Sequence, residues 1–156
     1  MEVVVKLKFT TPSLGNERRE QRDLMMRSKD GNVLMLQSWW RCSMAFAAKA
    51  LGCFTREVEQ IQVDPEVKGT TGIYRRWYNS TSFKEHEAFL IGTEIEARML
   101  LPNGIKPSDL RRLLETAGRY VGLSAYGYKE NFGRFVVVSV EQVGVKHEVQ
   151  KEAGDH

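Results

Sequence analysis

A basic and aromatic stretch, IYRRWYNSTSFKEH at residues 73–86, contains the residue types best suited to contact nucleic acid. Arginine and lysine bind phosphates and aromatic rings stack on bases, so the mixture is typical of proteins that bind single strands. In a strand, alternate residues point to opposite faces, so one face could bind while the other packs. The expected contacts are Arg75, Arg76, Trp77, Tyr78 and Lys84. An equally good interpretation is a structural hairpin whose rings cover a sheet and whose arginines are solvated.

A second stretch, GLSAYGYKENFGRF at residues 122–135, predicts a loop between a helix and a strand. At about ten residues it is longer than most such connections, a length typical of functional or disordered loops. Its glycines would allow positive φ and a close approach to a ligand, or would only turn the chain. The expected contacts are Tyr126, Tyr128, Lys129 and Arg134, and the expected loop glycines are Gly122, Gly127 and Gly133. A phosphate loop of the NTPase kind is excluded, because there a strand precedes the loop and a helix follows it.

Catalytic and metal-binding patterns are sparse. His86 stands between two glutamates, but neighbours in a strand point to opposite faces and cannot form a compact ligand set. We therefore expect no metal, no cofactor and a binding protein rather than an enzyme. The enzymatic alternative is a metal-independent endoribonuclease, with His86 as general base, Tyr74 or Tyr78 as acid, and Lys129 supporting the charged phosphorane.

The composition indicates an ordinary globular chain of 156 residues with a net charge of +3, compatible with nucleic-acid binding without requiring it. No apolar stretch reaches the roughly 18 residues of a membrane span. The opening MEVVVKLKF lacks the features of a signal peptide, so we expect a cytoplasmic protein without membrane contact. The two cysteines are too few for a disulfide framework, and Cys42 is expected in the core.

Hydrophobic periodicity predicts four sheet strands, two helices and a hairpin. Gly52 is expected to cap the first helix, and Ser108 to be the N-cap of the second. Residues 13–36 are expected to be a mixed-charge loop or short helix. The expected strands are 2–12, 57–63, 88–102 and 134–144, the helices 37–52 and 106–123, and the hairpin 69–89 with its turn at 79–82.

This order predicts an α+β fold of the ferredoxin-like βαββαβ plan. Two helices would cover one face of an antiparallel sheet and an inserted β-hairpin would extend it. Residues 1–146 would form a single domain and residues 147–156 a polar C-terminal tail.

Two motifs carry a resemblance to a known family. KLKFTTPSLGN at residues 6–16 and GLSAYGYKENFGRFVVV at residues 122–138 resemble the first strand and the glycine-rich loop of the RAMP superfamily of CRISPR-associated RNA-binding proteins. The resemblance implies RNA binding by a ferredoxin-like domain. CRISPR members usually carry a second domain or long insertions, and their loop has more glycines. Compact relatives also look like bacteriophage proteins that interfere with RNA-guided defence.

Three functions follow as hypotheses. The first is a small protein that binds RNA or single-stranded nucleic acid through the two stretches. The second is a bacteriophage-type inhibitor or assembly subunit that binds a host protein or ribonucleoprotein such as a CRISPR defence complex. Aromatic and arginine residues are common in such interfaces. This hypothesis is compatible with self-association of the chain. The third is the endoribonuclease built on His86.

Overall fold

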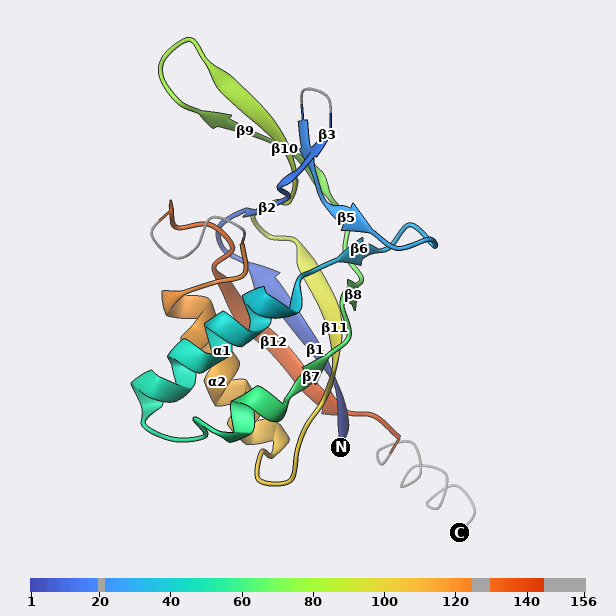
Figure 1. The fold of residues 1–156 in the computed structure, drawn as a ribbon, viewed down its shortest axis with the longest axis vertical. Helices are drawn as coiled ribbons and strands as arrows, with labels where there is room; N and C mark the ends of the chain where they lie inside the picture. The colour runs from blue at the N-terminus through green and yellow to red at the C-terminus, as the bar shows by residue number, and fades with distance from the viewer. Residues whose placement is uncertain (20–21, 125–129, 145–156) are drawn as a thin grey trace.

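A four-stranded antiparallel sheet lies at the centre of the protein (Figure 1). The computed structural model describes residues 1–19, 22–124 and 130–144. The strand order is β12–β1–β11–β7, and every neighbouring pair is antiparallel. The strands are β1 (Glu2–Phe9), β7 (Gln62–Val63), β11 (Glu94–Leu100) and β12 (Phe135–Gln142).

Alternation in the sequence decides which face of this sheet is buried. Along β1 the buried residues are every second one, and along β11 Ile95, Ala97 and Met99 are buried while their neighbours are more exposed. The period of two places one apolar row of each strand on one face. The buried row of β1 consists of Val3, Val5, Leu7 and Phe9.

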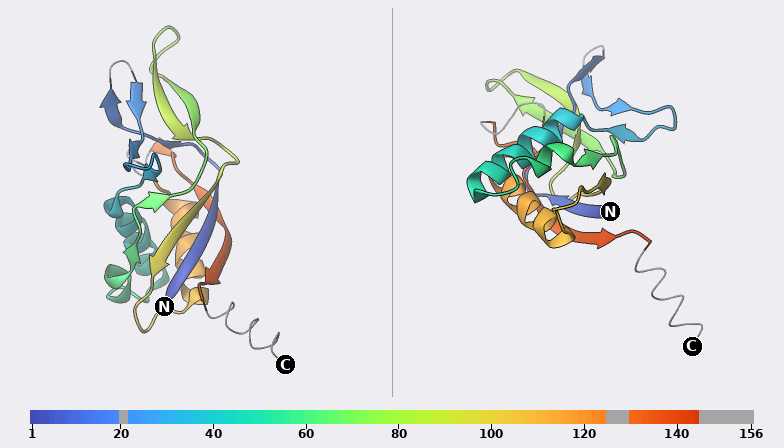
Figure 2. Two further views of the ribbon diagram at one scale, coloured as in Figure 1. Left: turned by 90° about the vertical axis from the view of Figure 1, so that its right-hand side faces the viewer. Right: turned by 60° about the horizontal axis from the view of Figure 1, so that its bottom comes forward.

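The two helices cover that apolar face and leave the other open (Figure 2). Helix α1 (Gln37–Leu51) packs on helix α2 (Pro107–Tyr120), and α2 packs on β12. Leu110, Leu113 and Leu114 are fully buried, and burying each such side chain contributes about 2 kcal/mol. Tyr120, the last residue of α2, is half exposed.

The helix ends follow local sequence signals, with one correction. Gly52 ends α1 with φ of 73°, as predicted for a left-handed cap. The prediction of Ser108 as N-cap of α2 is wrong, because Pro107 occupies the first helical position and Lys106 is the cap. Proline suits that position since its missing N–H would have no helical partner. The Asp109 carboxylate accepts a hydrogen bond from the Lys106 N–H at 3.0 Å.

Residues 13–36, predicted as a loop or short helix, instead supply short strands to two smaller sheets. Strands of two or three residues are too short for a readable alternation, and β2, β4 and β6 also pair with strands that are distant in sequence. One sheet has the order β2–β10–β4–β3 with β9 paired to β10. Its strands are β2 (Ser13–Leu14), β3 (Glu17–Arg19), β4 (Arg22–Leu24), β9 (Gly72–Trp77) and β10 (Phe83–Phe89); the other sheet has β5 (Met26–Arg27), β6 (Val33–Leu34) and β8 (Glu66–Val67).

Two further predictions are corrected. The strand expected at 57–63 is a 3₁₀ helix, η1 (Glu57–Gln60), followed by β7. Val58 and Ile61 are both buried, and their spacing of three suits a 3₁₀ turn rather than a strand. Cys42, expected in the core, is exposed, because the buried stripe of α1 runs through Trp40 and Met44 and leaves Cys42 on the outer side.

The described residues thus form an α+β structure with two α-helices and three sheets, in which every strand pair is antiparallel except β4 with β10. No helix within the described ranges is long and apolar enough to cross a membrane. The predicted tail, residues 147–156, lies outside the described residues.

Candidate nucleic-acid interface

The hairpin of β9 and β10 extends beyond the end of the main sheet, away from both helices (Figure 1). Its strands pair antiparallel from Gly72↔Ala88 to Trp77↔Phe83, which confirms the predicted hairpin. The turn is closed by the Asn79 side chain, whose Oδ1 accepts hydrogen bonds from the N–H groups of Thr81 and Ser82. Asparagine favours such turns because its side chain can replace a backbone acceptor.

The outward face of the hairpin combines an arginine with two aromatic rings. Trp77 and Phe83 lie opposite each other with ring centroids 4.7 Å apart. The Arg75 guanidinium lies 4.8 Å from the centre of the Phe83 ring. Trp77 is 55% exposed and Phe83 41% exposed. This face therefore presents apolar rings and a cation to solvent side by side.

The inward face is held by hydrogen bonds. Arg76 donates from Nε to Nε2 of His86 at 3.3 Å and from Nη2 to the Tyr78 hydroxyl at 3.1 Å. The Arg76 guanidinium also lies 5.0 Å from the centre of the Tyr78 ring. These contacts fix the Arg76 side chain, while Tyr78 at the tip remains 58% exposed.

Lys84 is committed to an ion pair. Its Nζ lies 2.9 Å from Oδ2 of Asp23, a residue of β4 that is only 4% exposed. Breaking such a pair would leave a buried carboxylate without its cation. Lys84 therefore anchors the hairpin to β4 and is less available to a phosphate than Arg75.

His86 lies inside the base of the hairpin and has no exposed surface. Its Nδ1–H donates to the Gly15 carbonyl at 2.8 Å, so Nε2 is the acceptor for Arg76. Burial lowers the pKa of His86, outweighing the Gly15 hydrogen bond and the nearby Asp23 charge, which raise it. A general base must come within hydrogen-bond distance of the substrate hydroxyl. In this conformation both ring nitrogens of His86 are engaged and none of its surface is exposed, so a substrate hydroxyl cannot reach it.

The hairpin contacts the segment that follows the glycine-rich loop. The rings of Tyr74 and Phe132 meet edge to face with centroids 5.8 Å apart. The Gly133 N–H donates to the Pro12 carbonyl at 2.7 Å, next to the start of β2. The structure thus brings the hairpin and one end of the second predicted binding stretch together.

Gly122 and Gly133 have positive φ, 86° and 72°, as the sequence predicted. A Cβ on Gly133 would lie 2.1 Å from the Leu123 carbonyl oxygen, and one on Gly122 would lie 2.6 Å from the Gly133 carbonyl. Neither position can accept a side chain without movement of the backbone. In the described part of the loop the glycines therefore let two chain segments approach each other. Four predicted residues of this loop lie outside the described residues: Tyr126, Gly127, Tyr128 and Lys129.

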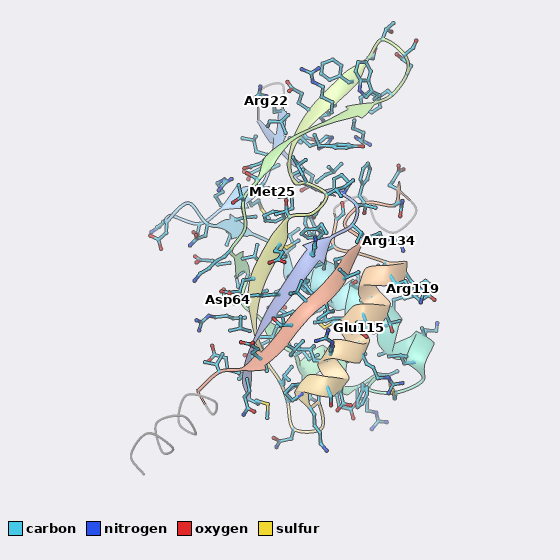
Figure 3. The ribbon with its side chains drawn as sticks, turned by 180° about the vertical axis from the view of Figure 1, so that it is seen from behind. Arg22, Met25, Asp64, Glu115, Arg119 and Arg134 are labelled. Atoms are coloured by element: carbon cyan, nitrogen blue, oxygen red, sulfur yellow. The ribbon has the colours of Figure 1, made fainter. Side chains whose placement is uncertain are left out.

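Arg134 lies at the start of β12, beside the end of α2 (Figure 3). Its guanidinium donates to the Arg119 carbonyl in the last turn of α2. A cation at a helix C-terminus is stabilised by the helix dipole. The structure accordingly places Arg134 with α2 and not with the cations of the hairpin.

The carboxylates that hold the hairpin were not found in the sequence. Asp23 holds Lys84, and Glu87 accepts hydrogen bonds from Thr71, the Met25 N–H and Arg27. Burial favours a raised pKa for Glu87, but these hydrogen bonds and the Arg27 charge prevail and lower it. The sequence between each carboxylate and its partners gives no local signal of such pairing. No group of three or more potential metal ligands exists in the part of the chain that the structure describes.

Comparison with known proteins shows similarity of fold. One neighbour is a chain in the cryo-EM structure of the Type III-B Cmr-beta bound to cognate target RNA, with a TM-score of 0.60 and 9% identity, covering 90% of this chain and 59% of that chain. Another is a chain of a Type IV-B CRISPR complex, with a TM-score of 0.57 and 11% identity, covering 93% of this chain and 92% of that one. This chain thus spans about three fifths of the first neighbour. No protein-family model and no curated protein sequence matches. The shared fold agrees with the RAMP-like resemblance.

Proposed function

We propose that the protein binds RNA or single-stranded nucleic acid through the β9–β10 hairpin. The observation that carries this proposal is the pairing of cations with exposed aromatic rings at 4.8 and 5.0 Å on a hairpin that projects into solvent. Stacking on a base contributes about 1–3 kcal/mol, and neighbouring guanidinium groups contribute phosphate binding that depends on salt.

Within this proposal the residues divide by chemistry. Arg75 and Arg76 contact phosphates, while Trp77, Tyr78 and Phe83 stack on bases. Lys84 holds the hairpin in place through Asp23. Tyr126, Tyr128, Lys129 and Arg134, together with the glycine-rich loop, remain predicted contacts of the same ligand.

We further propose that the main sheet is ferredoxin-like and the protein a RAMP-type subunit. The strand order β12–β1–β11–β7, with a helix between β1 and β7 and another between β11 and β12, supports this. The two neighbours belong to CRISPR complexes, and one of those complexes is bound to RNA. Fold similarity alone does not determine a ligand, so the binding experiment decides.

The test is fluorescence anisotropy of a labelled 15-nucleotide oligouridylate titrated with the full chain at several salt concentrations. We expect binding at low salt and a logarithmic affinity that falls linearly with the logarithm of salt. The same oligonucleotide should remain intact in the presence of a chelator, since His86 is buried. Absence of binding at low salt, or an affinity indifferent to salt, contradicts the proposal.

A protein partner is the second candidate, and the exposed apolar side chains of Ile73, Trp77 and Phe83 favour it. Aromatic residues of this kind are the usual anchors of protein interfaces. The partner would be another subunit, a second copy or a host CRISPR complex; the bacteriophage origin and cytoplasmic location remain predictions. Partners recovered from a bacterial lysate by the wild-type chain after nuclease treatment, and lost with Trp77→Ala, would favour this candidate over nucleic acid.

A further inference from the structure

A groove between the outer surfaces of α1 and α2 is unrelated to the hairpin. Its volume is about 650 Å³. The hairpin projects away from the two helices, so the two surfaces are separate (Figure 1). The residues that matter for its chemistry are Phe46, Leu51, Arg112, Glu115, Arg119 and Tyr120.

The groove has an apolar centre. Phe46 from α1 is 44% exposed and Tyr120 from α2 is 51% exposed, although both are large and belong to helices that bury their other faces. Ala50 and Leu51 continue the apolar surface along the last turn of α1. Large exposed apolar residues that gather on one surface indicate an interaction site.

The rim of the groove is positively charged. Helix α1 contains two cations, Arg41 and Lys49, and no carboxylate. On α2, Glu115 is paired with Arg111 at 2.9 Å, while Arg112 and Arg119 have no carboxylate partner among the described residues. Glu115 and Arg119 lie along the same helix, one turn apart (Figure 3). The surface therefore offers uncompensated positive charge beside an apolar floor.

We propose that this groove binds an acidic amphipathic helix of a protein partner. From Arg112 to Tyr120 the groove follows α2 for about 12 Å, or two helical turns, which suits apolar anchors spaced at i and i+4. Acidic residues beside those anchors would meet Arg112 and Arg119. Charge complementarity of this kind increases the association rate and excludes basic segments.

Nucleic acid fits the groove less well than such a helix. The floor of Phe46, Ala50 and Leu51 offers no side-chain hydrogen-bond donor or acceptor for a base edge. The aliphatic and aromatic anchors of a peptide need no such hydrogen-bond donor or acceptor.

The test uses a labelled synthetic 14-residue peptide, capped at both ends, with leucines at i, i+4 and i+7 and glutamates around them. Three comparisons accompany it: a permuted peptide without an apolar face, an analogue with lysine for every glutamate, and the oligouridylate. Binding to the full chain is followed by anisotropy and by amide shifts in nuclear magnetic resonance spectra. Of the three peptides, we expect only the glutamate peptide to bind, with shifts at Phe46, Leu51 and Tyr120, while the oligouridylate should leave these three residues unshifted.

The double variant Arg112→Glu/Arg119→Glu should weaken peptide binding by about tenfold or more. Lys6→Glu/Lys8→Glu, with the same charge change on the open face of the sheet, should leave peptide binding unchanged. The proposal is overturned if no peptide binds, if the lysine analogue binds as tightly, if the shifts map to the hairpin, or if the oligouridylate occupies the groove instead. Because Trp77→Ala should not affect the peptide, failure here is distinguishable from failure of the hairpin proposal.

Discussion

The hairpin and the open face of the main sheet are both exposed β-surfaces, yet they differ in chemistry. On the sheet, Lys6 lies opposite Glu96 and Lys8 opposite Glu94. Arg98 pairs with Glu2 at 3.0 Å, and no aromatic residue lies on this face within the described strands. On the hairpin, arginines lie over aromatic rings. Exposed side chains and an alternating strand pattern therefore do not identify a binding surface. The group that each charged side chain contacts does identify it.

The physical reason is the local field. Opposite charges on neighbouring strands neutralise each other and leave little attraction for a polyanion. On the hairpin, Glu85 is shared between Arg22 and Arg75, so positive charge remains in excess there, and the guanidinium groups of Arg75 and Arg76 are held over rings by the ring quadrupole. The difference predicts that equal charge changes on the two surfaces will have unequal effects on RNA binding.

The largest expected effect comes from reversing charge on the hairpin. Arg75→Glu/Arg76→Glu should weaken oligouridylate binding by roughly 100-fold at low salt, since removing a phosphate interaction of about 1.4 kcal/mol lowers the affinity tenfold. The salt slope should fall by about 0.7 for each phosphate that the protein no longer binds. Anisotropy titrations measure both quantities.

The matched control is Lys6→Glu/Lys8→Glu on the open sheet face, which changes the net charge equally. We expect it to lower the affinity far less, by only a few-fold through long-range repulsion. Equal decreases in the two double variants would mean that net charge alone drives binding and that the hairpin is not the site.

Removing one ring is expected to have the next largest effect. Trp77→Ala should weaken oligouridylate binding by about 5- to 150-fold, the range expected for one stacking interaction, without changing the salt slope. Leu100→Ala removes a similarly exposed apolar side chain from the open sheet face and is expected to be neutral. If Trp77→Ala changes the slope as strongly as the affinity, the ring does not act by stacking.

Acid should destabilise the hairpin more than the open face of the main sheet. The pKa of His86 is lowered below its ordinary value of 6.5 in the folded protein, so its contribution to stability is present above pH 6.5 and is lost as the pH falls through the folded pKa. Each unit of difference corresponds to about 1.4 kcal/mol. Thermal unfolding from pH 7.5 to pH 5 should show this loss.

His86→Gln should remove the pH dependence in this range while retaining a side chain that can form hydrogen bonds. The further loss below about pH 4.5 should persist, because the lowered pKa of Glu87 makes its contribution disappear only on stronger acidification. A wild-type protein with constant stability between pH 7.5 and 5 contradicts the assignment of a neutral buried His86.

The smallest effect is expected at Glu85, which lies 4.0 Å from Arg75 and 3.5 Å from Arg22. Glu85→Gln should tighten oligouridylate binding by about two- to fivefold, because exposed ion pairs are worth at most about 1 kcal/mol. Glu94→Gln on the sheet face is the control and should change affinity less. A decrease in oligouridylate affinity with Glu85→Gln would mean that the Arg75–Glu85 ion pair orients Arg75 for binding a phosphate.

The long, regular elements were predictable because local sequence determines them. Alternation identified β1 and β11, and the helical stripe of Leu110, Leu113 and Leu114 identified α2. The hairpin followed from two β-rich arms around Asn79. The predicted alternation of the two faces of β9 is confirmed, and Arg75 and Trp77 lie on the more exposed one. Elements of two to four residues were missed, because hydrophobic periodicity cannot be detected over so few positions.

The sequence by itself thus determined three of the four strands of the main sheet, both helices and the hairpin with its basic and aromatic residues, because these depend on local periodicity and turn chemistry. Only the tertiary structure decided which of those residues are available to a ligand. It buried His86, bound Lys84 to Asp23 and turned Arg134 to the end of α2. Each of these outcomes depends on groups distant in the chain that folding brings within hydrogen-bond distance. Burial and ion pairing are therefore properties of the assembled fold and not of any local stretch.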